Sequence, residues 1–163
     1  MTLGKILVSQ SDRSYIIKLV GDVRVTLCAS LNNYMEVIFK SEKISEIIVD
    51  MVDTEGADST TLGLLAKLAI YSNDKFKIRP IVFCPDESLY ETLMVMGLDD
   101  VFEIVQSLRL RLEDYEELPV DVPSTVVDRT KQHVLDAHHL LSSFSEKNKH
   151  EFLDLIQTLE EER

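Results

Sequence analysis

The sequence predicts an α/β domain, a sheet covered by helices, followed by a C-terminal α-helical hairpin. Three observations support this prediction. Segments of strand and helix character alternate through the first two thirds of the chain in the order β-β-α-β-α-β-α-β. The composition then changes to a charged stretch that contains two prolines. Two amphipathic segments end the sequence.

The first elements follow from short β-branched runs and one apolar stripe. Residues 5–10 and 15–20 are joined by the polar tetrad 11–14, so they are predicted to pair as a hairpin on the edge side of the sheet. Residues 26–40 carry apolar side chains at spacings of three and four, which predicts an amphipathic helix. Residues 44–51 contain a nearly continuous apolar run, typical of a central strand buried on both faces.

The remaining elements of the domain repeat this alternation. Residues 53–58 are mostly polar and are predicted to be a loop that leads into a helix over 59–72. Residues 78–84 repeat the buried-strand pattern, and acidic residues then begin a helix that Gly97 ends. Residues 101–105 are the last short strand, which closes a unit of ordinary domain size.

We divide the chain into a domain over 1–107, a charged linker over 108–123 and a helical hairpin over 124–163. Ser145 is predicted to be the N-cap of the second helix of the hairpin. Three arrangements remain open for this hairpin. It packs back on the domain's sheet, pairs with another copy in a homodimer, or offers a second partner site.

The composition excludes several classes of protein. Seventeen Lys and Arg against 29 Asp and Glu give a formal net charge of -12, a field that opposes binding to nucleic acid. No apolar run is long enough to span a membrane, so no membrane partner is expected. Cys28 and Cys84 are interpreted as reduced core thiols, and the N-terminus lacks the pattern of a signal peptide. The predicted location is the cytoplasm.

Other chemistry has little support. No two of His133, His138, His139 and His150 lie three or four residues apart, so no metal site is predicted. The sequence has no glycine-rich nucleotide-binding motif, and no cofactor is expected. A hydrolase with Ser59 as nucleophile is disfavoured, because we expect no His near Ser59 and no convincing oxyanion arrangement. We therefore predict that the chain is not an enzyme and has no catalytic residues.

The most informative segment follows the buried strand and the acidic loop, where residues 58–63 read Asp-Ser-Thr-Thr-Leu-Gly. Asp, Ser and Thr before a helix commonly cap its free N–H groups, and the local pattern alone favours this interpretation. The alternative is that a hydroxyl here is phosphorylated. The new charge would be stabilised by the N–H groups of the helix and would repel an acidic or apolar partner.

This strand, loop and helix resemble the STAS domain of bacterial anti-sigma factor antagonists, where an Asp-Ser-Ser-Gly-Leu-Gly type motif carries the regulatory serine. By this resemblance Ser59 matches the phosphorylated serine and Asp58 the acidic residue before it. Leu62 and Gly63 match the end of the motif, and Asp50 matches an Asp that closes the central strand in the family.

The resemblance covers about residues 1–107, and the predicted order of elements agrees with the family's fold. Thr60 and Thr61 stand where the family usually has a second serine and a glycine. Both keep a hydroxyl, so both are less favoured alternative acceptors. The branched side chain of Thr61 puts the choice of partner, more than the fold, in question.

The resemblance implies partner switching. The unphosphorylated protein would bind an anti-sigma factor or serine kinase with a histidine-kinase-like ATPase fold and free its sigma factor. Phosphorylation of Ser59 would release the complex, and a serine phosphatase would reset it. The predicted partner-binding residues are Asp58, Ser59, Thr60, Thr61, Leu62, Gly63, Met94 and Met96.

A second hypothesis keeps the fold and omits the switch. The chain would be a constitutive adaptor or assembly subunit that binds partners through its C-terminal helices, with Ser59 only a helix cap.

Overall fold

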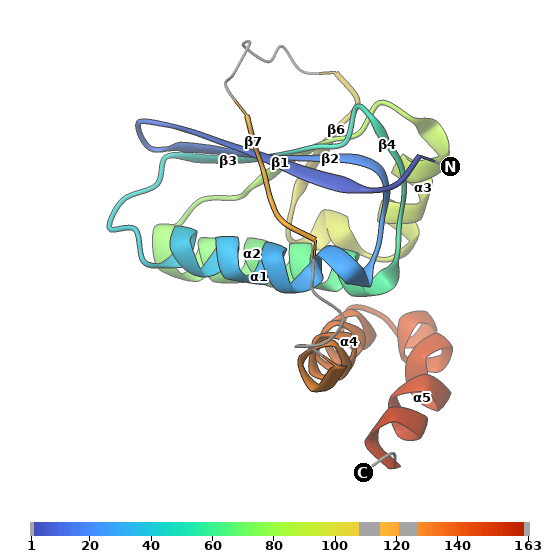
Figure 1. The fold of residues 1–163 in the computed structure, drawn as a ribbon. Coiled ribbons are helices and arrows are strands. Elements are labelled where there is room, and N and C mark those ends of the chain that lie inside the picture. Colours follow the sequence, from blue (N-terminus) through green and yellow to red (C-terminus); the bar gives the residue numbers. More distant parts are fainter. Residues whose placement is uncertain (1, 108–114, 121–126, 162–163) are drawn as a thin grey trace.

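Seven strands of the described residues form one mixed sheet (Figure 1). The structure, a computed structural model, describes residues 2–107, 115–120 and 127–161. The strands are β1 (Lys5–Ser11), β2 (Ser14–Val23), β3 (Glu46–Asp50), β4 (Thr54–Ala57), β5 (Ile81–Phe83), β6 (Glu103–Val105) and β7 (Glu116–Glu117). Their order across the sheet is β6-β5-β3-β2-β1-β7, and β4 pairs separately with β2.

The helices of the domain are η1 (Val25–Leu27), α1 (Cys28–Phe39), α2 (Ser59–Phe76), α3 (Glu87–Val95) and η2 (Leu98–Asp100). Helices α1 and α2 lie next to each other beneath the sheet (Figure 1). Their apolar side chains meet those of the strands in one core. Ile17, Leu19, Met35, Leu65 and Leu68 are among its fully buried members. The predicted fold class is therefore confirmed.

The predicted strand pairing is confirmed in the first half of the sheet. β1 and β2 are antiparallel, with Ser11 opposite Ser14 across the tight turn. Asp12 in this turn has a φ of 53°, a conformation that Asp tolerates better than most residues. β3 lies inside the sheet between β2 and β5, and Ile47 to Asp50 are buried, as expected for a strand covered on both faces.

The predicted loop over 53–58 is wrong, because the structure forms strand β4 within it. β4 is parallel to β2, and the register shifts between Gly21 and Asp22. This bulge lets the backbone N–H of Gly21 donate to the carbonyl of Asp53 at 3.0 Å. The shift of register falls within this four-residue strand, which has no hydrophobic alternation to reveal it. β7, which pairs with β1, lies within the stretch for which the sequence predicts a linker.

The C-terminal hairpin consists of α4 (Val127–Ser142) and α5 (Glu146–Glu161) and forms a third layer (Figure 1). It lies on the side of α1 and α2 that faces away from the sheet, and α4 contacts α2, α1 and η1. The hairpin thus packs back on the domain, against its helices. Ser145 caps α5, since its Oγ accepts from the N–H of Asn148 at 3.1 Å, as predicted. No helix of the described residues is long and apolar enough to cross a membrane.

Candidate functional site

The candidate site is the N-terminus of α2, where β4 ends and the motif begins. Asp58 is the N-cap of α2 in an extended conformation, and Ser59 is the first helical residue. Ser59 and Gly63 are four residues apart and therefore lie on one face of the helix, one turn above the other. The local sequence thus places one hydroxyl and one glycine on the same side of α2.

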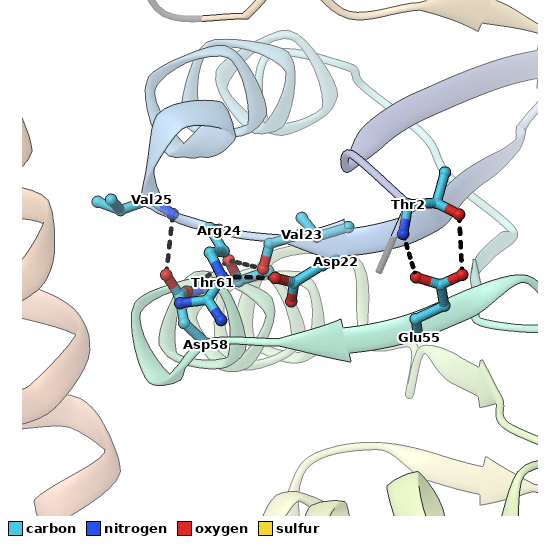
Figure 2. Close-up of polar contacts among 8 residues, drawn as sticks. All are labelled: Thr2, Asp22, Val23, Arg24, Val25, Glu55, Asp58 and Thr61. Atoms are coloured by element: carbon cyan, nitrogen blue, oxygen red, sulfur yellow. Dashed lines mark hydrogen bonds and ion pairs between the residues drawn. The ribbon is translucent and has the colours of Figure 1, made fainter.

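Asp58 joins α2 to the segment that follows β2 (Figure 2). Its Oδ1 accepts from the N–H of Thr61 at 2.9 Å and from the Thr61 hydroxyl at 2.8 Å. Its Oδ2 accepts from the N–H of Val25 at 2.9 Å. One carboxylate therefore satisfies donors from two parts of the chain: Val25, which lies 33 residues before Asp58, and Thr61, which lies three residues after it. This arrangement fixes the position of the α2 N-terminus relative to η1.

Two further polar contacts lie beside this corner (Figure 2). Glu55 in β4 accepts from the backbone N–H of Thr2 at 2.6 Å and from its hydroxyl at 2.9 Å. Arg24 pairs with Asp22 at 2.6 Å on the surface. The first of these contacts joins the N-terminal segment to β4.

The two threonines of the motif point into the protein. Thr60 is 4% exposed and Thr61 is fully buried. The hydroxyl of Thr61 lies near Asp58, the carbonyl of Val23 at 3.3 Å and the sulfur of Cys28 at 3.7 Å. In this conformation neither threonine offers its hydroxyl to another protein, whereas Asp58 and Ser59 are half-buried.

Ser59 is not the helix cap. The capping bonds belong to Asp58, and the Ser59 hydroxyl instead hydrogen-bonds Nε2 of His138 in α4, 79 residues away in sequence. The expectation that no histidine lies near Ser59 is therefore wrong, because the hairpin folds back over α2. Among the described residues no carboxylate hydrogen-bonds the His138 ring, so the pair lacks the acidic member of a hydrolase triad.

The surroundings of His138 favour the neutral form of its ring. Its burial lowers its pKa from the usual 6.5, and this effect outweighs the raising effects of the nearby Val134 backbone and the charge of Asp58. The neighbouring His139 lowers the pKa further. The ring also packs against Phe152 of α5, with a centroid distance of 4.8 Å. A neutral imidazole is the form that fits between apolar groups and a serine hydroxyl.

Leu62 and Gly63 are both buried, for different reasons. Leu62 belongs to the core. Gly63 faces α4, and a Cβ built on it would lie 2.6 Å from the Cα and 2.8 Å from the carbonyl oxygen of Ala137. Only glycine at this position lets the two helices approach this closely.

Met94 and Met96 lie at the C-terminal end of α3. Met94 is 38% exposed, while Met96 is half-buried against the core. The carbonyl of Met96 accepts from Nδ2 of Asn148 in α5 at 2.9 Å. The hairpin therefore reaches both predicted partner-binding clusters, at α2 and at α3.

Asp50 ends β3 as predicted and is 2% exposed. Its Oδ1 accepts from the N–H of Val52 at 3.0 Å. Burial raises the pKa of Asp50, against the opposing effects of this bond and of Lys18. Lys18 itself pairs with Asp53 at 3.1 Å. The Asp50 carboxyl orders the turn that leads from β3 to β4.

Within the part of the chain that the structure describes, no three His, Cys, Asp or Glu side chains come together as metal ligands. His139 pairs with Glu160 at 2.8 Å across the hairpin. Cys28 and Cys84 are both buried and are not joined in a disulfide, in agreement with the prediction of reduced core thiols.

The sequence interpretation missed the residues with which the hairpin covers the site, His138, Ala137 and Asn148. One signal was available. The predicted helix over 59–72 has apolar residues on more than one side, and Gly63 and Leu64 are both buried in addition to Leu62 and Leu65. A helix that is apolar on nearly all sides is usually covered on more than one side.

Comparison with known proteins identifies the fold. The family model of the STAS domain matches residues 5–111. One similar solved structure is described as the anti-sigma factor antagonist SpoIIAA in its unphosphorylated form, with 12% identity and a TM-score of 0.53. The similarity covers 63% of this chain and 89% of that one.

A second similar structure is an anti-sigma factor antagonist from Mycobacterium paratuberculosis, with 16% identity and a TM-score of 0.53, over 65% of this chain and 88% of that one. No curated protein matches the sequence. The family match ends before α4 begins, so it does not include the hairpin.

Proposed function

Because the chain belongs to the STAS domain family, we propose that it is a cytoplasmic anti-sigma factor antagonist switched by phosphorylation of Ser59 in a bacterial partner-switching pathway. The observation that supports this most directly is the place of Ser59. It is the first residue of α2, directly after a capping Asp, where the STAS motif has its regulatory serine. Its hydroxyl is not used for capping, so it is chemically available once α4 moves away.

The unphosphorylated protein binds an anti-sigma factor or serine kinase with a histidine-kinase-like ATPase fold. Binding keeps that partner from holding its sigma factor. The kinase then transfers phosphate to Ser59, the complex separates, and a serine phosphatase restores the first state. Two solved structures with this fold are described as anti-sigma factor antagonists, which supports this choice of partner.

The physical basis of the switch is the charge added at the start of α2. A phosphoserine brings nearly two negative charges, which the N–H groups of the first helical turn stabilise in water. In a complex the same group would be desolvated beside the Asp58 carboxylate, which is engaged in its own hydrogen bonds. A difference of a few kcal/mol between the two forms is enough for an effective switch.

The adaptor hypothesis loses one of its premises, because Asp58 and not Ser59 caps α2. Its other premise is partner binding through the C-terminal helices, and the partner-capture experiment described below tests it.

The first test is mass spectrometry of the protein purified from its native cells under two growth conditions. We expect a phosphate on Ser59 whose occupancy changes with the condition. Good coverage of peptides that contain Ser59, without phosphate in any condition, would contradict the switch.

The second test compares partner capture by three full-length variants. Ser59→Asp should abolish capture of the ATPase-fold partner, and Ser59→Ala should retain it. Ser88→Asp is the matched control, since Ser88 is exposed and lies in the first turn of α3, which Asp86 caps. Capture that survives Ser59→Asp would favour the adaptor hypothesis.

A further inference from the structure

The hairpin covers the face of α2 that begins with Ser59. Ser59 and Gly63 form one side of this helix, and both contact α4: Ser59 through the His138 ring and Gly63 through the backbone of Ala137. Ala137 is 2% exposed and His138 is 3% exposed. The residue proposed to be phosphorylated is therefore held by the chain's own C-terminal helix.

The hairpin also holds the end of α3. Asn148, which is fully buried, donates to the carbonyl of Met96 at 2.9 Å and to that of Leu141 at 3.0 Å. Phe144 packs against Gly97, where a built Cβ would lie 3.2 Å from its Cβ. One hairpin thus contacts the α2 cluster and the α3 cluster at the same time.

The docked interface contains polar groups that a permanent core would avoid. Leu141 joins the main core, but His138 and Asn148 are buried polar side chains at the contact with the domain. On release both regain hydrogen bonds to water, so undocking costs less free energy than exposing apolar side chains of the same size. This composition suits an element that leaves its site reversibly.

We propose that the α4–α5 hairpin is an intramolecular cover of the partner-binding face, so that hairpin docking and partner binding exclude each other. This inference rests on the proposed function and adds a step to it. A partner or kinase reaches Ser59 only when the hairpin is undocked, because the His138 ring occupies the position next to the Ser59 hydroxyl. The closed conformation therefore protects Ser59 from phosphorylation and the α2 face from capture.

The test weakens docking by substitutions within the hairpin and leaves residues 58–63 unchanged. In the full-length Ala137→Leu variant the larger side chain has no space against Gly63, because backbone atoms of both helices are already in contact there. Gln132→Leu is the matched control: it introduces the same residue at an exposed position of α4. A second variant, Asn148→Ala, removes the contact at α3.

Amide hydrogen exchange measures undocking directly. In Ala137→Leu we expect exchange to be at least about tenfold faster over 132–153 and faster over 59–66, with β2 and β3 still protected. Asn148→Ala should shift the same segments in the same direction, and Gln132→Leu should match the wild type. Wild-type protection of both segments in Ala137→Leu and Asn148→Ala would overturn the inference.

A fluorescent synthetic peptide of residues 127–161 then tests whether the uncovered face accepts a helix in trans. We expect saturable binding to Ala137→Leu and little binding to the wild type, whose face is occupied. Equal binding to both, or binding to neither, would overturn the inference. A change of size with concentration in the wild type would instead indicate that the hairpin pairs copies of the chain, which also overturns it.

The competition between hairpin docking and partner binding is tested with the ATPase-fold partner that is recovered in the experiment with the Ser59 variants. Its affinity for Ala137→Leu should be at least about tenfold higher than for the wild type and for Gln132→Leu. Equal affinities would overturn the inference while leaving the proposed function intact. If no such partner is recovered and Ser59 carries no phosphate, the proposed function fails, and the exchange and peptide measurements still decide whether the hairpin is a reversible cover.

Discussion

The contact between Gly63 and Ala137 predicts opposite effects of one methyl group on two parts of the same protein. Gly63 lies inside α2, and in an isolated helix Gly→Ala is worth about 1 kcal/mol of stabilisation. In the docked protein the added Cβ would lie 2.6 Å from the Cα and 2.8 Å from the carbonyl oxygen of Ala137. These are backbone atoms, so they cannot turn away as a flexible side chain would.

The magnitude follows from the cost of overpacking. Extra carbon atoms in a well-packed contact typically cost about 1 to 3 kcal/mol. All of this strain lies between α2 and α4, so undocking of the hairpin relieves it. We therefore expect Gly63→Ala to favour undocking by roughly 5- to 150-fold, while the α/β domain becomes no less stable.

Amide hydrogen exchange and urea unfolding separate the two effects. Exchange of the hairpin should accelerate in Gly63→Ala, and the unfolding midpoint of the sheet should stay the same or rise. Asn73→Ala is the control, because Asn73 is an exposed residue of α2 and its substitution raises helix propensity without a contact to α4. Hairpin protection in Gly63→Ala equal to that in Asn73→Ala would refute the close approach on which the reasoning depends.

Three further predictions follow from named groups. Asp58→Ala removes an acceptor of three hydrogen bonds and should lower the free energy of unfolding, measured in urea, by about 2 to 4 kcal/mol. The control is Asp86→Ala, whose side chain accepts only a capping bond from one N–H and should cost about 1 kcal/mol. Burial lowers the pKa of His138 below the unfolded value of 6.5, so the stability of docking is fully present above pH 6.5 and is lost as pH falls toward the folded pKa. Amide exchange of the hairpin, measured relative to a short reference peptide, should therefore be faster at pH 5.5 than at pH 7.5. The His138→Asn variant should remove this difference. Burial, with a smaller contribution from Asp86, raises the pKa of Cys84 to about 11. At pH 8 this thiol should therefore react with iodoacetamide far more slowly than the thiol of glutathione, and equal rates would contradict its burial.

Much of the fold could be predicted from the sequence because most of its elements carry local patterns. The apolar run that forms β3 is buried on both faces, and the stripe of α1 faces the core. β4 could not be predicted this way. Its four residues contain Glu55 and Gly56, and it is held by pairing with β2 across a shift of register. That pairing is a property of two segments together, which periodicity in one segment does not reveal.

The candidate site divides in the same way. The capping role of Asp58 is local, since its main acceptor bonds go to a residue three positions ahead, and a sequence pattern is enough to suggest it. The contact from Ser59 to His138 spans 79 residues and depends on where the hairpin docks. Neither amphipathic stripe of the hairpin specifies its target, because an apolar stripe fits any apolar surface of suitable shape.

The two sides of α2 explain how one helix would serve both stability and the proposed exchange of partners. One side contributes large apolar side chains such as Leu65 to the core, and their exposure would unfold the domain. The side toward α4 begins with Ser59 and Gly63, which bury little apolar area of their own. Its occupant is therefore held by close backbone approach, a few polar contacts and the apolar side chain of Leu141, and another helix with a small residue opposite Gly63 could take its place. A single phosphate at Ser59 would act on that exchangeable side and leave the permanent one unchanged.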